Sequence, residues 1–208
     1  SKSKSLRYAG NRVKLFSIPE FLTFTIREFN LDSVNLICKI NNKFSNHIVA
    51  IRSSAKDEDT KNNSAAGEYE SVLNIPSDNT ERIIESINIV IASYEKKRQL
   101  LSDDEVIIQE MVKNPTMSGV IFTHDLNTGA PYYVINYDDQ SGTTDTVTSG
   151  NGEYANRTLY IHRNSIGKLR SERFIKLLQA VQELEQVMNS KFLDIEFALD
   201  ENLTPYLL

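Results

Sequence analysis

The segment Arg52–Ser54 combines residue types that can bind phosphate. It directly follows an apolar run at residues 47–51, which is typical of a buried strand, and the polar residues 56–64 have the composition of a loop. The guanidinium of Arg52 offers donors in a fork that matches phosphate oxygens, and a loop able to close would exclude water from a phosphoryl transfer. A surface ion pair fits the pattern equally well, with one of three acidic residues as the partner: Asp57, Glu58 or Asp59.

A second candidate site is the pair of carboxylates Asp194 and Glu196. Successive side chains of a strand point to opposite faces, so both carboxylates would share one face while Ile195 and Phe197 occupy the other. Two carboxylates beside phosphates would suit Mg²⁺, which prefers oxygen ligands. Taken alone, the pattern favours an ordinary solvated strand face.

Several common catalytic motifs are absent from the sequence. It contains no P-loop, no Gly-x-Gly-x-x-Gly dinucleotide motif, no Gly-x-Ser-x-Gly elbow and no Cys/His spacing of a zinc site. The three histidines, His47, His124 and His162, are scattered along the chain. A lone histidine is more often a surface or core residue than a catalyst, so position alone assigns none of them a catalytic role.

The composition predicts a soluble, cytoplasmic protein that binds neither nucleic acid nor membranes. The 208 residues carry a formal net charge of −5, whereas a general nucleic-acid binder carries a basic face. No apolar run is long enough to span a bilayer. The single cysteine, Cys38, cannot form a disulfide within the chain and favours a reducing compartment. Because Leu36 and Ile37 precede it, we expect a buried core thiol.

Hydrophobic patterning predicts an α+β fold with mostly antiparallel sheets. A helix is expected from Pro19 to Phe29, and two longer amphipathic helices are expected over residues 83–94 and 174–188. Short strand-like runs bounded by turn residues make up most of the rest, at residues 47–51, 68–75, 105–112, 118–123, 132–137, 159–162, 194–199 and 205–208.

Five motifs, in order along the chain, resemble the ATP-binding domain of phosphoenolpyruvate synthase and pyruvate phosphate dikinase. The segment Arg52–Asp59 is similar to the RSSAxxED motif of that family, and its expected continuation follows at Ala66–Ile75. The other three resemble the family's VQEMV, SGVxFT and DIEW/F motifs, and they lie at Ile108–Val112, Ser118–Thr123 and Asp194–Phe197. Five motifs in the right order are far more specific than any one of them.

The resemblance implies an ATP-grasp fold, in which two α+β lobes hold ATP between them. Residues 1–103 would form the first lobe, which binds the phosphates, and residues 104–208 the second, which contacts adenine and metal. The implied nucleotide contacts are Arg52 and Ser53 at the triphosphate, Ala66 and Gly67 in a loop over the phosphates, and Gln109, Glu110 and Val112 at adenine, partly through backbone groups.

Three further assignments follow from the resemblance. Glu196 matches the family's Mg²⁺-binding glutamate, with Asp194 beside it. Lys2, four residues before Leu6, matches the phosphate-binding lysine of the family's GGKxxxL start, although the two glycines are absent, and this makes the N-terminal segment a candidate strand or loop at the nucleotide. His124 stands where the family usually has arginine, so a phosphate contact there would be weakened or would need a protonated histidine.

The implied activity is that of a dikinase-like phosphotransferase. In the family, Mg·ATP phosphorylates a histidine on a separate swivelling domain, and this histidine passes the phosphoryl group to an acceptor. Pyruvate is the default acceptor, and relatives use others, such as rifampicin or the glutamine of capsule phosphoramidate synthesis. Because the family's LQxRP motif would begin where the sequence reaches Leu208, we expect the chain to be a fragment of a longer enzyme and inactive by itself.

A non-catalytic nucleotide-binding or regulatory module is the alternative hypothesis. The features that favour it are His124 and the segment Gly142–Asp145, which stands in place of the family's GLGE. Nucleotide binding without ATP consumption by the full-length protein would support this alternative, whereas turnover would support the enzyme.

We predict that none of His47, His124 and His162 forms a stable phosphohistidine, because the family carries that residue on a separate domain. The chain is incubated with γ- and β-labelled ATP, and any protein-bound label is tested for stability in acid and base. We expect no stoichiometric label on these histidines. A stoichiometric acid-labile phosphate on one of them would show that the phosphocarrier lies within residues 1–208.

Overall fold

The structure is a computed structural model that divides into two units. The described residues are 1–54, 69–97, 99–144 and 157–208. Unit 1 contains Ser1–Ser5 and Pro19–Met111, and unit 2 contains Leu6–Ile18 and Val112–Leu208. This division differs from the boundary expected between residues 103 and 104, because the next strand along the chain pairs within the sheet of unit 1. Among the described residues, no helix has both the length and the apolar composition needed to span a membrane.

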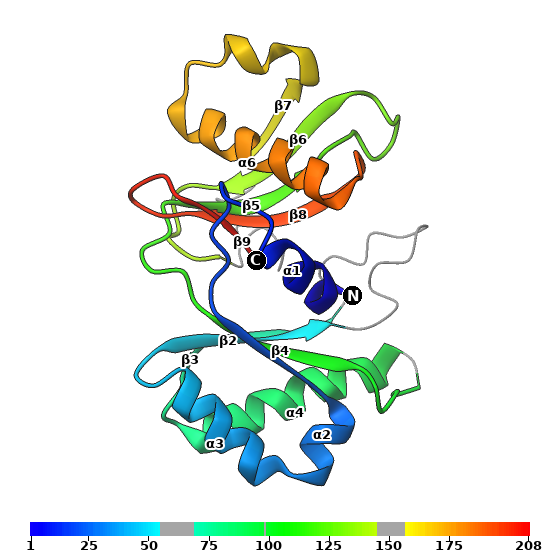
Figure 1. The fold of residues 1–208 in the computed structure, drawn as a ribbon, viewed down its shortest axis with the longest axis vertical. Helices are drawn as coiled ribbons and strands as arrows, with labels where there is room; N and C mark the ends of the chain where they lie inside the picture. Colours follow the sequence, from blue (N-terminus) through cyan, green and yellow to red (C-terminus); the bar gives the residue numbers. More distant parts are fainter. Residues whose placement is uncertain (55–68, 98, 145–156) are drawn as a thin grey trace. The chain divides into compact units, whose positions relative to one another are not determined.

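Unit 1 is built on a four-stranded antiparallel sheet in the order β1-β4-β2-β3 (Figure 1). Its strands are β1 (Phe21–Thr25), β2 (Ile48–Ser54), β3 (Ser71–Pro76) and β4 (Glu105–Glu110). Its helices are α2 (Ile26–Leu31), α3 (Ser33–Lys43) and α4 (Thr80–Lys97), together with the start of α1 (Lys2–Gly10). The predicted strands 47–51 and 105–112 and the helix over 83–94 are therefore confirmed.

The core of unit 1 lies between one face of this sheet and the helices. Helix α4 contacts β2, β3 and β4, and α3 packs against α4. Alternate strand residues point into this core, where apolar side chains are removed from water, which is the main stabilising contribution to the fold. The fully buried members include Val49, Ile51, Ile83, Ile87, Val90, Val106 and Ile108.

The helix predicted from Pro19 to Phe29 is wrong in its first half. Residues Phe21–Thr25 form β1, which pairs antiparallel with β4. Aromatic residues and threonine suit a pleated, half-buried surface, and the partner strand decides between two patterns that both fit the sequence. Helix α2 begins only after Thr25, because Thr25 and Glu28 form a capping box. The Thr25 side chain accepts a hydrogen bond from the Glu28 N–H, and the Thr25 N–H donates to the Glu28 carboxylate at 2.7 Å.

The prediction of a buried thiol at Cys38 is also wrong, because Cys38 is exposed. It lies in α3, where Leu36, Ile37 and Ile40 are buried. Successive residues of an α-helix are rotated by about 100°, so the third residue of an apolar run leaves the buried side.

Unit 2 contains a five-stranded antiparallel sheet in the order β7-β6-β5-β8-β9 (Figure 1). The strands are β5 (Met117–Phe122), β6 (Tyr132–Asp138), β7 (Arg157–His162), β8 (Asp194–Leu199) and β9 (Pro205–Leu207). The 3-10 helix η1 (Arg163–Lys168) and helix α6 (Glu172–Met188) connect β7 to β8. These elements confirm the predicted strands after residue 118 and the second long helix.

The glycine of the segment Ser118–Thr123 has a structural role in unit 2. Gly119 lies in β5 opposite Tyr137 of β6. A Cβ atom at this position would lie 2.0 Å from the backbone oxygen of Asn136, closer than any real side chain approaches. The two strands can therefore pair at this distance only because the residue is glycine.

Candidate functional site

Arg52 and Gln109 meet on one face of the sheet of unit 1. They lie on the paired strands β2 and β4, and their neighbours Ile51 and Ile108 are buried in the helix-covered core. Alternation along each strand therefore places Arg52 and Gln109 on the other face. The Nη1 atom of Arg52 donates a hydrogen bond to Oε1 of Gln109 at 3.2 Å. A cation suited to phosphate is thus held in position by a neutral amide oxygen.

The first turn of α1 is attached to the end of β2. The Ser3 N–H donates to Oγ of Ser54 at 2.9 Å, and the Ser3 hydroxyl donates to the carboxylate of Glu105. Tyr94 of α4 supports the same place, because its hydroxyl accepts from the Ser54 N–H at 2.7 Å. The strand or loop expected at Lys2 is wrong, since Lys2 begins a helix whose first turn is fixed by these buried bonds. They hold the backbone at Lys2 beside the end of β2.

The structure separates the two serines that follow Arg52. Ser54 shares the sheet face of Arg52, whereas the buried side chain of Ser53 points to the helix-covered face. Ser53 is therefore not brought together with Arg52 through its hydroxyl, whereas Ser54, which the implied nucleotide contacts leave out, lies on the same face as Arg52. The expected phosphate-covering residues Ala66 and Gly67 lie outside the described residues.

The residues expected to contact adenine, Gln109, Glu110 and Val112, lie at the end of β4 and just after it. The Glu110 N–H donates to the backbone oxygen of Glu20 at 2.8 Å, and the Met111 N–H donates to the first residue of β2 at 2.9 Å. The Glu110 carboxylate lies 3.2 Å from Nδ1 of His47. Val112 follows as a buried residue. The N–H groups of Glu110 and Met111 are therefore used by the sheet, so an adenine contact from this segment would use other backbone groups.

Asp194 and Glu196 share one face of β8, with Ile195 and Phe197 buried on the other, which confirms the predicted alternation. Glu196 is half-buried and lies opposite Val120 of the neighbouring strand, whereas Asp194 is exposed. In the described part of the chain, no group of three His, Cys, Asp or Glu side chains could hold a metal ion by itself. Mg²⁺ is commonly held by one or two carboxylates and phosphate oxygens, so this oxygen-donor pair fits Mg²⁺ that is shared with a nucleotide.

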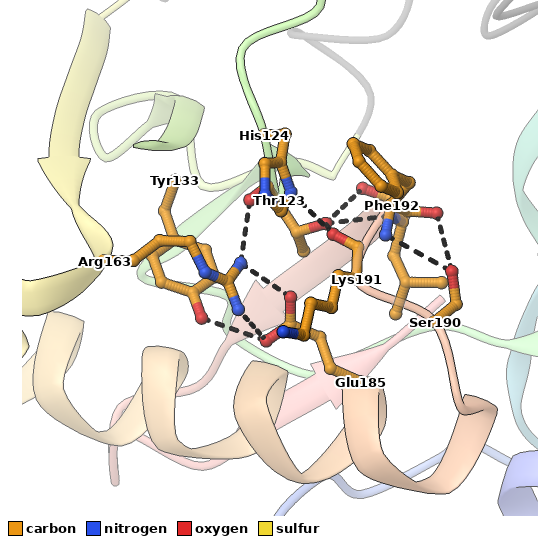
Figure 2. Close-up of polar contacts among 9 residues, drawn as sticks. Thr123, His124, Tyr133, Arg163, Glu185, Ser190, Lys191 and Phe192 are labelled. Carbon is orange, nitrogen blue, oxygen red and sulfur yellow. Dashed lines mark hydrogen bonds and ion pairs between the residues drawn. The ribbon is translucent and has the colours of Figure 1, made fainter. Parts of the chain in front are cut away.

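His124 follows β5, and its ring contacts two residues of the segment before β8 (Figure 2). Its Nδ1 atom lies 2.7 Å from the backbone oxygen of Lys191, and the ring packs against Phe192 with 4.4 Å between centroids. A carbonyl oxygen only accepts, so Nδ1 carries the hydrogen and the neutral ring has no donor at Nε2. A phosphate contact by His124 would therefore require the protonated ring.

An ion pair between the partly exposed Arg163 and the buried Glu185 is a feature that the sequence did not predict (Figure 2). Each terminal nitrogen of Arg163 lies 2.7 Å from one carboxylate oxygen, and Nη1 also donates to the backbone oxygen of Thr123 at 2.9 Å. The Tyr133 hydroxyl donates to the same carboxylate at 3.0 Å, and the guanidinium lies over the Tyr133 ring. These contacts connect η1 and α6 to Tyr133 in β6 and to Thr123, the residue directly before His124.

The network changes the titration of two of its members. Burial raises the pKa of Tyr133 to about 12, with a further contribution from the negative charge of Glu185. Hydrogen bonding to Glu185 raises the pKa of Arg163, so the guanidinium stays charged. Because the folded-state pKa of Tyr133 lies above its ordinary value of 10.0, its contribution to stability is present below pH 10 and is lost as the pH rises toward about 12.

Comparison with solved structures identifies the fold. The similar structures are ATP-grasp ligases: D-alanyl-alanine synthetase A from Vibrio cholerae (TM-score 0.53, 16% identity), the VanG D-Ala:D-Ser ligase from Enterococcus faecalis (0.51, 13%) and the D-alanine-D-alanine ligase from Helicobacter pylori (0.50, 11%). Each match covers 99% of this chain and 53%, 50% and 48% of the other chain, respectively. The chain thus spans about half the length of these neighbours, and at such identities the likeness shows the fold alone. No curated protein matches the chain in sequence.

The fold and the family model together define the class of protein. Two antiparallel sheets with flanking helices, similar to those of ATP-grasp ligases, give the chain an ATP-grasp-type fold. The model of the pyruvate phosphate dikinase AMP/ATP-binding domain matches residues 24–139, more than half of the chain. The chain belongs to this family of ATP-binding domains. The matched range includes Arg52, Ser53, Gln109, Glu110, Val112 and His124, whereas Lys2, Asp194 and Glu196 lie outside it.

We predict that Glu185→Gln lowers the free energy of unfolding by about 2 kcal/mol, because it leaves the partly exposed charge of Arg163 without a carboxylate and weakens its hydrogen bonds. Chemical denaturation measures this change. The matched control is Glu85→Gln, which removes an exposed ion pair with Arg82 on α4 and should change stability by no more than about 0.5 kcal/mol. If the two substitutions have equally small effects, the pair of Arg163 and Glu185 does not stabilise unit 2.

Proposed function

We propose that this ATP-binding domain is part of a longer phosphotransferase that resembles phosphoenolpyruvate synthase. In that enzyme, Mg·ATP would phosphorylate a histidine on a separate swivelling domain, and the histidine would pass the phosphoryl group to an acceptor, with pyruvate as the default. The observation that carries this proposal is Arg52, which lies in an RSSA-like motif and is held by Gln109 on the sheet face away from the packed core.

In this proposal Arg52 binds the phosphates through its planar fork. Phosphoryl transfer depends mostly on positioning and on neutralising the charge of the phosphate oxygens, so a fixed guanidinium contributes to both. Lys2 would add a second cation. The bonds of Ser3 to Ser54 and Glu105 support this role, because they attach the start of α1 to the end of the strand that carries Arg52.

Glu196, with Asp194 beside it, would hold Mg²⁺ in this proposal. The ion supplies charge neutralisation at the phosphate oxygens. The position of Glu196 supports the role, because a half-buried carboxylate in a strand that pairs with β5 is restrained by the sheet, with its backbone oxygen accepting from the Leu208 N–H at 3.0 Å. Asp194 is exposed and would contribute less.

In this proposal the chain binds ATP, and none of its residues identifies the acceptor. Glutamine, as in capsule phosphoramidate synthesis, or an antibiotic such as rifampicin could replace pyruvate. Assays of the full-length protein with each acceptor, scored by the labelled product, distinguish these substrates.

A non-catalytic nucleotide-binding module is a second candidate, and the contacts of His124 favour it. This residue stands where the family usually has arginine, and its Nδ1 is already bonded to Lys191. If the full-length protein binds Mg·ATP but releases neither AMP nor phosphate in the presence of any acceptor, the non-catalytic role is correct.

We predict that Arg52→Lys in the full-length enzyme lowers turnover at least about tenfold, equivalent to about 1.4 kcal/mol of transition-state stabilisation. Lysine keeps the charge but loses the fork that contacts two oxygens. Steady-state ATP consumption measures the effect, with the exposed Arg82→Lys as the matched control. Wild-type turnover and nucleotide affinity in Arg52→Lys would rule out the proposed role.

We predict that Glu196→Gln strongly slows phosphoryl transfer while the protein stays folded, because the amide keeps the shape but loses the charge that binds Mg²⁺. Raised Mg²⁺ should restore part of the activity. Turnover is measured against Mg²⁺ concentration, with a thermal unfolding curve for each variant and the exposed Glu201→Gln as control. Unfolding of the Glu196→Gln variant, with an unchanged Mg²⁺ dependence, would indicate a structural role instead.

A further inference from the structure

The amide nitrogen of Gln109 is buried and has no hydrogen-bond partner among the described residues. Gln109 is only 2% exposed, and it lies in β4 on the sheet face that also carries Arg52. A buried donor without an acceptor is unfavourable, and folded proteins keep few such groups, so each one calls for an explanation. The Nε2 atom therefore needs an acceptor that the described residues do not supply.

Arg52 determines which end of the amide is the donor. Its Nη1 atom donates to Oε1 of Gln109 at 3.2 Å. If the oxygen and nitrogen of the amide were exchanged, the NH₂ group of Gln109 would face the N–H of Arg52, and both groups are donors. The NH₂ group must therefore be the end of the amide that does not face Arg52. The guanidinium and this NH₂ group are thus neighbouring donors on one face of the sheet.

An anionic oxygen is the acceptor that suits this arrangement best. The guanidinium is always charged, so a negatively charged oxygen near both groups gains electrostatic attraction in addition to a hydrogen bond. A ring nitrogen of adenine is neutral and gains only the hydrogen bond. A buried water is the other alternative, because such waters satisfy isolated polar groups in many proteins.

We propose that Gln109 donates through Nε2 to a phosphate oxygen of the nucleotide and positions the Arg52 guanidinium through Oε1. The two side chains then act as one phosphate-binding pair. This assignment rests on the proposed function, since the anion is a phosphate group of ATP. It moves the side chain of Gln109 from adenine, where the family resemblance puts this residue, to the phosphates.

The test compares ATP with adenosine, which keeps the base and ribose but has no phosphate. Affinities are measured for the full-length protein by calorimetry for ATP and by ligand-observed NMR for adenosine. Gln109→Glu has the same size but sets a carboxylate against the phosphate, and Gln109→Met removes the donor without adding charge. The matched controls are Gln179→Glu and Gln179→Met, at an exposed glutamine of α6.

We expect Gln109→Glu to weaken ATP binding at least about tenfold and to leave adenosine binding within about twofold, because only the phosphate contact is lost. Gln109→Met should unfold at or above the wild-type temperature without ligand, since a buried unpaired donor is gone, and it should lose part of the thermal shift produced by ATP. This second variant keeps the test decisive if the carboxylate prevents folding.

Three results would overturn the assignment, and they have different meanings. Equal losses for ATP and adenosine would return the Gln109 side chain to adenine. Unchanged ATP affinity in both Gln109 variants would mean that water or the fold satisfies the amide. Failure of the wild-type protein to bind ATP would overturn the proposed function itself, and this assignment with it.

Discussion

The antiparallel pairing of β2 with β4 is the constraint on which the candidate nucleotide site depends. It sets Arg52 and Gln109 on one face and Ile51 and Ile108 on the other. A shift of either strand by one residue would exchange the two faces, because side chains alternate strictly along a strand. Since Ile51 and Ile108 are completely buried against the helices, their packing fixes the register. The apolar core of unit 1 thus determines where its polar chemistry lies.

The same logic applies in unit 2, where a polar network adds to the packing. Burial of Ile195 and Phe197 in β8 fixes the face on which Glu196 lies. The pair of Arg163 and Glu185 connects helix α6 to η1 through charge-assisted hydrogen bonds, and the Tyr133 hydroxyl connects Glu185 to β6. This pair contributes less to net stability than its geometry suggests, because the buried Glu185 and the partly exposed Arg163 both lose hydration, but it disfavours arrangements that separate the partners.

Periodicity in the sequence is sufficient to predict most strands and the two long helices. The position of a cation directly after an apolar run is sufficient to identify Arg52 as a candidate phosphate-binding residue. Residues near Phe21 were misassigned because aromatic residues at that spacing fit a helix and a strand alike, and only pairing with β4 decides. Glu185 carried a usable signal: it lies four residues after Val181 on the apolar side of α6, where a carboxylate needs a buried partner. The identity of that partner, Arg163, depends on tertiary contacts that no local pattern contains.

We propose that ATP binds to this chain through the paired strands β2 and β4 and the residues that follow β4. Photolabelling of the full-length protein with an azido-ATP that reacts from its base, followed by peptide mapping, tests this claim most directly. We expect saturable labelling within residues 105–112 that excess ATP prevents. Labelling that ATP does not prevent, or that maps only to other parts of the protein, would contradict it.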